Sequence, residues 1–341
     1  MRVWEMAGVA AVVTAAMVGA GFASGREIVV FFARFGWAGY GGAALASALM
    51  GLSVRGLMLL AARARSDSLP ELMRSGLGRS YGSGALMAAM LLTVASAMTA
   101  AGGELGALLV NVQGARQLGM ALTAAVAAAA ALRGLGALRA LGWLTVLAAL
   151  LYYAVLAGAS PGGSPAIAWR PGAALAAVAY AGFNVSTACG VICAAGRRLE
   201  GDARRQAGIA GALTGGMMLA LLALALACMR LHWADIEHAP LPSVLISARL
   251  GLPGYYGTIA FMWIAVMSTL AGVVLALRLQ AEAAGLPGRA AVLCALSAAV
   301  LVGCLGFETL VSTLYPALGL VLAAYLAALL LTEMRKGRGA H

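Results

Sequence analysis

Apolar residues dominate the chain in long runs, and clusters of Gly, Pro and Arg separate these runs. An α-helix needs roughly 20 apolar residues to cross the hydrocarbon core of a bilayer. The pattern therefore predicts an all-α integral membrane protein with about ten transmembrane helices joined by short loops. The ten runs have approximate limits of 6–34, 38–62, 82–110, 117–133, 139–159, 172–195, 206–229, 252–277, 289–306 and 309–332.

The composition agrees with this pattern and excludes several functional classes. Of 341 residues, 63% are hydrophobic and 10% are charged, whereas a soluble chain is about 45–50% apolar and about 25% charged. A water-soluble globule could not bury this excess, so we exclude a large soluble catalytic domain and a nucleic-acid-binding chain. The three histidines lie outside the apolar runs, and no P-loop, CxxC or HExxH motif is present. We therefore expect a protein that is not an enzyme and whose surroundings are the lipid bilayer.

The placement of basic residues predicts the orientation in the membrane. The formal net charge is +11, and most of the arginines fall in alternate loops, such as 63–79 and 197–205. Loops that remain in the cytoplasm carry an excess of Lys and Arg. This bias predicts a multi-pass protein of the cell (inner) membrane with both termini in the cytoplasm. Arg55 lies inside the second run, near its cytoplasmic end, where its long side chain is expected to reach the headgroups.

An internal repeat links the first and sixth runs. Ala20-Gly21-Phe22 and Ala181-Gly182-Phe183 are separated by close to half the chain. Since each half would contain five spans, an odd number, the two halves would cross the membrane in opposite directions, as in many secondary transporters. We therefore expect one transmembrane transporter domain over 1–341, with repeats at about 6–159 and 172–332. In such folds the first helix of each half is discontinuous near the middle of the bilayer.

The two expected breaks differ in their residues. Three glycines between positions 19 and 25 permit a break in the first run, while Asn184, Ser186 and Thr187 would place polar groups beside a break in the sixth. Unwound backbone inside a membrane is tolerated only where it is buried in protein or lines a cavity, so a break implies a site. The alternative is helix packing, because Gly21 and Gly25 also form a GxxxG pair.

Four further positions place polar groups inside the spans. Glu27 follows the expected break and Glu104 lies in the outer part of the third run; either carboxylate could form a structural ion pair or act in gating or coupling. Ser268 and Thr269 lie mid-span in the eighth run. Their hydroxyls could bond back to their own helix or coordinate a hard cation such as Na⁺. The tyrosines of the fifth and sixth runs could line a solute cavity or simply pack, and these are Tyr152, Tyr153 and Tyr180.

The segment from Val18 to Ile28, with the sequence VGAGFASGREI, resembles the helix-1 signature of YkvI-type membrane proteins. These are grouped as an amino-acid permease family within the amino acid–polyamine–organocation (APC) superfamily. The resemblance implies a LeuT-like fold in which helices 1 and 6 are broken around a central site. It also implies a substrate carboxylate bound by free N–H groups near Phe22–Gly25, and a substrate amine facing carbonyls near Ala181–Phe183. The chain has Arg26 where the family usually has Gln.

The resemblance extends to the coupling ion. Ser268 and Thr269 match the hydroxyl pair that forms a sodium site between helices 8 and 1 in sodium-coupled members, where carbonyls near Val18 and Gly21 would complete the shell. Some proton-coupled members replace that ion with a lysine in helix 5, and this chain has none in its fifth run. The resemblance therefore favours Na⁺ as the coupling ion and implies no other cofactor.

Together these observations predict a secondary active transporter of a small amino-acid-like or amine solute, coupled to sodium and working by alternating access. The alternatives are a proton-coupled transporter or exchanger, a channel, and a membrane sensor or scaffold that moves nothing. Glu27 and Glu104 are the candidates for coupling or gating. The candidate sodium ligands are Val18, Gly21, Ser268 and Thr269. The candidate substrate-binding residues are Gly21, Phe22, Ala23, Ser24, Gly25, Ala181, Gly182, Phe183 and Asn184.

Overall fold

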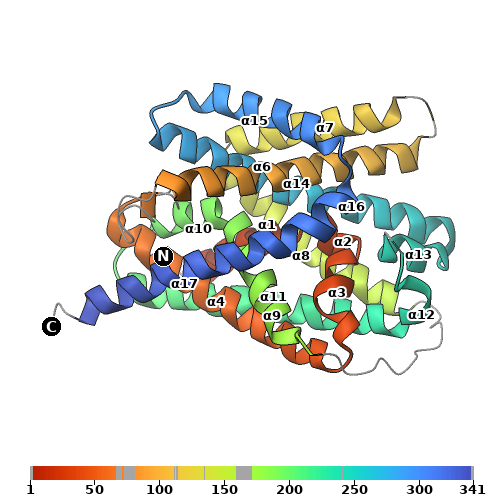
Figure 1. Cartoon of the computed structure of the whole chain (residues 1–341), viewed down its shortest axis with the longest axis horizontal. Coiled ribbons are helices and arrows are strands. Elements are labelled where there is room, and N and C mark those ends of the chain that lie inside the picture. The colour runs from red at the N-terminus through yellow and green to blue at the C-terminus, as the bar shows by residue number, and fades with distance from the viewer. Residues whose placement is uncertain are drawn as a thin grey trace.

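The computed structural model describes residues 3–66, 71–72, 81–110, 112, 114–133, 135–158, 171–239 and 241–338. Within these residues the ordered elements are all helical and none is a β-strand. Figure 1 shows the helices packed side by side into one elongated bundle.

The first half of the chain supplies the first five spans. The first span is made of three short helices and a 3₁₀ turn: α1 (Val3–Met17), α2 (Ala20–Ala23), α3 (Arg26–Phe31) and Ala33–Phe35. The next four spans are single helices: α4 (Ala38–Ala64), α6 (Tyr81–Leu109), α7 (Ala115–Arg133) and α8 (Leu135–Ala157).

The second half of the chain contains the remaining described helices. A bent pair forms the sixth span: α9 (Ala173–Thr187) and α10 (Cys189–Gly196). The helices α11 (Ala203–Leu231) and α14 (Gly251–Ala283) are long, and two short helices join them, α12 (Trp233–Ile236) and α13 (Pro242–Ala248). The chain ends with α15 (Gly288–Gly303), α16 (Phe307–Thr309), a π-helical segment Leu310–Leu314 and α17 (Tyr315–Arg338).

These helices correspond to the ten apolar runs. In the described part of the chain, six helices are long and apolar enough to cross a membrane: α4, α6, α7, α8, α11 and α14. The α9–α10 pair forms a seventh span with a bend of 61°. Three shorter apolar helices account for the remaining runs, at Trp4–Met17, Gly288–Gly303 and Tyr315–Leu331. The predicted all-α membrane architecture is confirmed.

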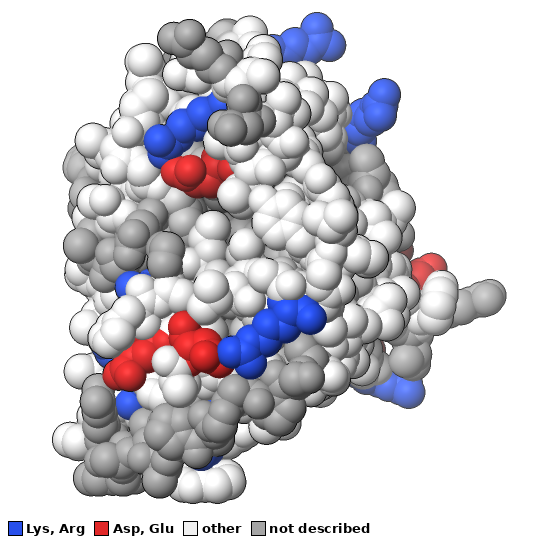
Figure 2. Space-filling view, turned by 90° about the vertical axis from the view of Figure 1, so that its right-hand side faces the viewer, with Lys and Arg blue, Asp and Glu red and all other residues white. Residues whose placement is uncertain are grey.

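The surface agrees with a lipid environment. Large apolar side chains point outward on several helices; Leu118 is 69% exposed and Leu301 is 74% exposed. Figure 2 looks at one end of the molecule instead, where charged side chains of both signs appear and some of the acidic groups lie beside basic ones. A soluble protein rarely exposes this much apolar surface, whereas the acyl chains of a bilayer would cover it.

The helices form two groups with the first span between them. In one group α6 contacts α7, α14 and α15, and in the other α4 contacts α9 and α11. Figure 1 shows these groups as the upper and lower parts of the bundle. The helix α1 contacts α11 of one group and α14 of the other. The first span is therefore central, and almost every side chain from Met6 to Phe35 is buried or half-buried.

Candidate substrate site

The first span is discontinuous, as predicted, but it is interrupted at two points and not at one. The helix α1 ends at Met17, α2 occupies only four residues, and α3 begins at Arg26. Gly25 joins α2 to α3 with a φ of 79°, a left-handed conformation that glycine adopts without the steric penalty of a Cβ. The break therefore depends on glycine at this position.

The backbone of this turn satisfies its own hydrogen bonds. The N–H groups of Ala23, Ser24 and Gly25 each donate to a carbonyl three or four residues earlier, at 2.9, 2.8 and 3.0 Å. The Arg26 N–H donates to the Ser24 hydroxyl at 3.3 Å. Three of the four N–H groups in the segment Phe22–Gly25 are therefore occupied within the turn, and the binding of a substrate carboxylate there stays a prediction.

The carboxylate of Glu27 occupies the inner side of the turn. Glu27 is 3% exposed, and its side chain lies directly against Gly21. A Cβ placed on Gly21 would lie 2.5 Å from the carboxyl carbon of Glu27, far inside van der Waals contact, so Gly21 provides the space for this acid. Within the described residues, the Oε2 atom of Glu27 has no hydrogen-bond partner.

Three buried tyrosines from three other helices surround this carboxylate. The Tyr180 hydroxyl on α9 is its polar neighbour, and the hydroxyls of Tyr153 on α8 and Tyr315 on α17 lie within electrostatic range. Tyr153 donates its hydroxyl hydrogen to the Phe22 carbonyl. The Tyr315 hydroxyl has no hydrogen-bond partner among the described residues, and the Tyr180 hydroxyl has none besides its interaction with the Glu27 carboxylate itself. A carboxylate oxygen and two hydroxyls are thus left without other hydrogen bonds at one buried position.

Aromatic rings enclose these polar atoms. The ring of Tyr180 packs edge-on against Phe32, with centroids 4.9 Å apart, and Tyr315 stacks on Phe183 at 3.9 Å. Buried polar groups almost always have a hydrogen-bond partner, and leaving one unsatisfied costs about 1–3 kcal/mol. The cluster of Glu27, Tyr180 and Tyr315 is therefore the strongest candidate in the described structure for binding a polar ligand. We call it the acid–tyrosine cluster.

The break in the sixth span lies further along the chain than the repeated triplet. The helix α9 runs without interruption through Ala181–Phe183 and ends at Thr187, and the bend occurs at Ala188. The Gly182 carbonyl accepts the Ser186 hydroxyl at 2.8 Å. Ala181–Phe183 thus remain inside a helix in this structure, and contact between their carbonyls and a substrate amine stays a prediction.

The polar side chains next to this second break are satisfied by their own helix. Asn184 donates to the Tyr180 carbonyl at 3.0 Å, and Thr187 donates to the Asn184 carbonyl at 2.7 Å. Such back-bonding is a common way for these residue types to satisfy themselves in a helix. In this structure the side-chain N–H of Asn184 is used within α9, and its part in substrate binding stays a prediction.

The residue Gly182 packs against another helix. A Cβ placed on it would lie 2.6 Å from the Cβ of Ala323 and would also overlap the Gly319 carbonyl oxygen, both on α17. Small residues allow helices in membranes to approach closely in this way. Of the three residues in the second triplet, Phe183 is the one that the structure connects to the acid–tyrosine cluster, through its stacking on Tyr315.

The pair Ser268–Thr269 lies beside the first break. The hydroxyl of Thr269 contacts the Ala15 carbonyl at 3.5 Å, and Ser268 is 5% exposed. In a continuous helix the Gly19 N–H would bond to Ala15, but it donates to the Met17 carbonyl at 3.1 Å. The break therefore leaves the Ala15 carbonyl free to face Thr269. Hydroxyl and carbonyl oxygens are ligands that suit a hard cation.

The other two predicted sodium ligands are placed differently. Val18 lies in the non-helical link, fully buried, and its N–H donates to Thr14 at 3.0 Å. The Gly21 carbonyl accepts the Ser24 hydroxyl at 3.1 Å. The structure thus brings Ala15, which the sequence did not single out, to Thr269, and it uses the Gly21 carbonyl within the turn.

The remaining acid of the prediction, Glu104, has a partner at the surface. It joins α6 to α7 through an ion pair with Arg116, and the two side chains are 38% and 43% exposed. The arginine next to Glu27 also has its own partner, since Arg26 donates to the Ala239 carbonyl at 3.2 Å. The gating or coupling role of Glu104 stays a prediction, and the geometry favours the structural alternative.

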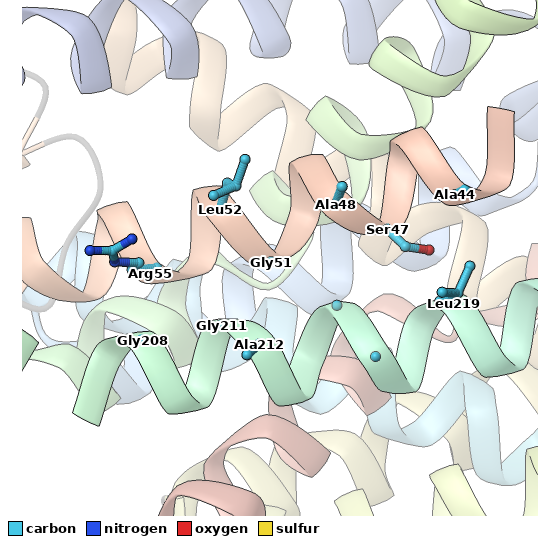
Figure 3. A pocket seen from close by; sticks show the side chains of 12 residues that line it. Ala44, Ser47, Ala48, Gly51, Leu52, Arg55, Gly208, Gly211, Ala212 and Leu219 are labelled. Carbon is cyan, nitrogen blue, oxygen red and sulfur yellow. The ribbon is translucent and has the colours of Figure 1, made fainter. Parts of the chain in front are cut away.

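A second feature is a groove between α4 and α11, with a volume of about 500 Å³. The two helices cross closely here, because a Cβ on Gly51 would lie 2.7 Å from the Gly211 carbonyl oxygen. Figure 3 shows Arg55 near one end of the groove and Leu219 near the other. Leu52 also lines the groove and is 62% exposed, so the groove opens at the outer surface of the bundle and is separate from the acid–tyrosine cluster.

One feature of the site escaped the sequence analysis. Tyr315 follows directly after the π-helical segment Leu310–Leu314, a rare type of helix that often accompanies functional sites. Neither the π-helix nor the approach of Tyr315 to Glu27 has a local signature in the sequence. The run of apolar residues around position 315 predicts a span and nothing more specific.

The chain is similar in sequence to a known membrane protein. The sequence matches no family model. A protein of Bacillus subtilis (strain 168), described as the uncharacterized membrane protein YkvI, is 26% identical over 335 residues, which cover 94% of each chain. A YkvI protein is thus similar to almost the whole chain, and its description names no solute.

Solved structures of transporters resemble the fold. MhsT in complex with L-phenylalanine matches 89% of this chain and 79% of its own, with a TM-score of 0.59 and 18% identity. Mhp1, a nucleobase-cation-symport-1 family transporter, matches 87% and 70%, with a TM-score of 0.56 and 15% identity. A manganese transporter of Eremococcus coleocola matches 95% and 76%, with a TM-score of 0.59 and 15% identity. The predicted LeuT-like fold is confirmed.

Proposed function

We propose that the protein is a secondary active transporter that carries a small amino-acid-like or amine solute by alternating access. The observation that carries this proposal is the acid–tyrosine cluster beside the broken first span. Ionisable groups inside a membrane are costly and generally mark a site of function. A buried carboxylate with an unpartnered oxygen, beside two hydroxyls with no further partner in the described structure, suits a polar solute better than it suits packing alone.

The position of the first span supports alternating access. This span contacts both helix groups, and transporters of this architecture work largely by rocking one group against the other around a fixed site. Hydrogen bonds also tie the turn to the segment between α11 and α14. The Ser243 N–H donates to the Ser24 carbonyl at 2.8 Å, and Arg26 donates to Ala239. Movement of that segment would change access to the cluster from one side of the membrane.

Sodium is the proposed coupling ion. The support is the contact between Thr269 and the Ala15 carbonyl, together with the buried Ser268 beside it. An ion held between α14 and the broken span would favour the conformation in which the span has its binding geometry. By linkage, solute binding would then tighten ion binding by the same factor.

The proposed organisation is one transporter domain over 1–341, built from repeats at about 6–159 and 172–332, with both termini in the cytoplasm of an inner-membrane protein. The two breaks support the repeat, since each lies in the first span of its half. The orientation is tested by introducing a cysteine at each terminus in turn. A reagent that cannot cross the membrane then shows from which side that cysteine is labelled.

The experiment that tests the function is uptake into proteoliposomes that contain the purified protein. Labelled amines and amino acids are offered with an inward sodium gradient, with an inward proton gradient in choline, or with neither. Concentrative uptake that needs sodium supports the full proposal. Uptake driven by protons supports the transporter and overturns the ion. Ion conductance without concentrative uptake indicates a channel, and binding without flux indicates a sensor or scaffold.

A further inference from the structure

We propose that Glu27 supplies the negative charge that binds the cation of the solute, so that the site takes a primary amine and does not require a carboxylate on it. This inference rests on the proposed function and narrows its substrate class. It also departs from the sequence-based expectation, which placed a substrate carboxylate at the turn of the first span.

A substrate carboxylate would have to lie at the turn of the first span. The N–H groups of Ala23, Ser24, Gly25 and Arg26 already have acceptors within the turn, so of the segment Phe22–Gly25 only the Phe22 N–H is left to meet an external anion. The carboxylate of Glu27 lies against the same turn, over Gly21. A second carboxylate at this position would meet a like charge in a medium of low dielectric, where repulsion is strong.

The carboxylate of Glu27 has no positively charged partner among the described residues. Burying an ion without a partner is costly in a protein interior, and no salt bridge in the described part of the chain involves Glu27. The adjacent Arg26 directs its guanidinium to the Ala239 carbonyl. The positive partner of Glu27 is therefore not supplied by the described residues, and a cationic solute would supply it.

The oxygen atoms of the acid–tyrosine cluster suit the hydrogen-bond donors of an ammonium group. An ammonium group has three N–H donors and no acceptor. The acid–tyrosine cluster presents three oxygen atoms without hydrogen-bond partners outside the cluster among the described residues: Oε2 of Glu27 and the hydroxyl oxygens of Tyr180 and Tyr315. All three can accept. A primary ammonium therefore matches the cluster in charge and in the type of atom that the cluster offers it.

Aromatic rings lie beside the acid–tyrosine cluster. The rings form two packed pairs beside these oxygens, Tyr180 with Phe32 and Tyr315 with Phe183. A cation near an aromatic face is attracted by the ring quadrupole, and the attraction is larger where water is excluded. The same rings give an apolar surface for the carbon chain of an amine.

Three sets of matched compounds test the inference on purified protein in detergent with sodium present. Each set contains an amino acid, the amine obtained by removing its carboxylate, and the acid obtained by removing its amine. The sets are alanine, ethylamine and propionate; leucine, isoamylamine and isocaproate; and phenylalanine, phenethylamine and hydrocinnamate. Binding is measured by thermal shift and by titration calorimetry. We expect at least one amine to bind and the corresponding acid not to bind.

Variants then connect the binding to the carboxylate. Glu27→Gln keeps the shape and removes the charge, and we expect it to weaken amine binding by about tenfold or more, the usual effect of losing a charged hydrogen bond. Glu27→Asp keeps the charge and should retain part of the affinity. Tyr315→Phe should give a smaller loss. Glu104→Gln is the matched control, because that acid lies in an exposed ion pair, and it should bind as the unmodified protein does.

The outcomes separate this inference from the proposed function. The inference is overturned if an acid binds, if an amino acid binds while its amine does not, or if no amine binds. It is also overturned if Glu27→Gln leaves amine binding unchanged. If Glu27→Gln does not fold, the ranking of amine against acid and the Tyr315→Phe variant decide. Glu27-dependent amine binding without uptake into proteoliposomes overturns the transporter and keeps the inference. Uptake of an acid that does not depend on Glu27 does the reverse.

Discussion

The two Ala-Gly-Phe triplets occupy related places in the two halves of the chain, yet their glycines meet different neighbours. Gly21 lies against the flexible end of the Glu27 side chain, whereas Gly182 lies against the backbone of α17. The first glycine makes room for a polar group inside the membrane, and the second lets two helices approach. The same triplet therefore has different structural roles at the two positions, because the neighbour of each glycine determines what the absence of a Cβ allows.

The two breaks differ in the same sense. At the first break the acid–tyrosine cluster retains three polar atoms without partners outside the cluster in the described structure. At the second break Asn184, Ser186 and Thr187 all donate to carbonyls of their own helix. The first span therefore has unpartnered buried polar atoms beside its interruption, as a binding site would, while the polar side chains at the bend of the sixth span donate within their own helix.

The largest effect that sharpens this comparison is expected from Gly182→Ala. The added Cβ would overlap the Gly319 carbonyl, and a packed backbone can move only by separating α9 from α17. Overpacking of this kind costs about 1–3 kcal/mol of stability, seen as a lower unfolding temperature in detergent. Gly208→Ala is the matched control, since a Cβ there has no atom within 4 Å. Equal stability of the two variants would mean that α9 and α17 are not held so closely.

Removing the hydroxyl pair beside the first break should separate sodium from solute. Ser268→Ala with Thr269→Val keeps the volume nearly constant and takes away both side-chain oxygens. Coupling energies between ligands are typically about 1–3 kcal/mol, or roughly 5–150-fold in affinity, and we expect sodium to lose this effect on amine binding. Thr93→Val is the control, because its hydroxyl bonds only to the Ala89 carbonyl of its own helix. Sodium dependence that survives the double substitution would exclude this pair as the ion site.

A smaller effect is expected at the second break from Thr187→Val. The variant removes one back-bonded hydroxyl and leaves the Asn184 carbonyl with its bond from the Ala188 N–H at 3.2 Å. The net contribution of such a hydrogen bond is about 0.5–1.5 kcal/mol, so stability should fall slightly. Amine affinity, measured by calorimetry, should stay within twofold of the unmodified protein. A large loss of affinity would show that the second break also binds the solute.

The smallest effect is expected from Glu104→Gln. Exposed ion pairs contribute about 0–1 kcal/mol, so the unfolding temperature should change little. Uptake into proteoliposomes should continue at the rate of the unmodified protein if the carboxylate only pairs with Arg116. Arg116→Gln, which breaks the same pair from the other side, should behave alike. A stable Glu104→Gln protein that loses concentrative uptake would instead establish the coupling or gating role.

The sequence predicted the architecture well because its signals are physical requirements of a bilayer. The length of the apolar runs follows from the cost of placing polar groups in hydrocarbon, whereas the orientation that the arginine-rich loops indicate stays a prediction. The break in the first span was also predictable, because three glycines within seven residues of Gly19–Gly25 weaken a helix wherever they occur.

The details of the site were less predictable because they depend on contacts between distant residues. Nothing near Gly182 indicates that Gly319 lies opposite, and this contact decides that the position packs a helix. Nothing near Tyr315 indicates that its hydroxyl approaches Glu27. The sequence did indicate that Glu27 is important, since an acid inside a span is rare, but its position over Gly21 emerged only from the fold.

The most direct test of a solute site at the first break is amine binding by Gly21→Ala, measured by calorimetry beside Gly182→Ala. A Cβ on Gly21 meets the flexible end of Glu27 and not a backbone, so the side chain can move aside and the protein should stay folded. We predict an unfolding temperature close to that of the unmodified protein and loss of amine binding, whereas Gly182→Ala should be less stable and bind normally. Normal binding by Gly21→Ala, with loss of binding by a stable Gly182→Ala, would contradict the assignment and move the site to the sixth span.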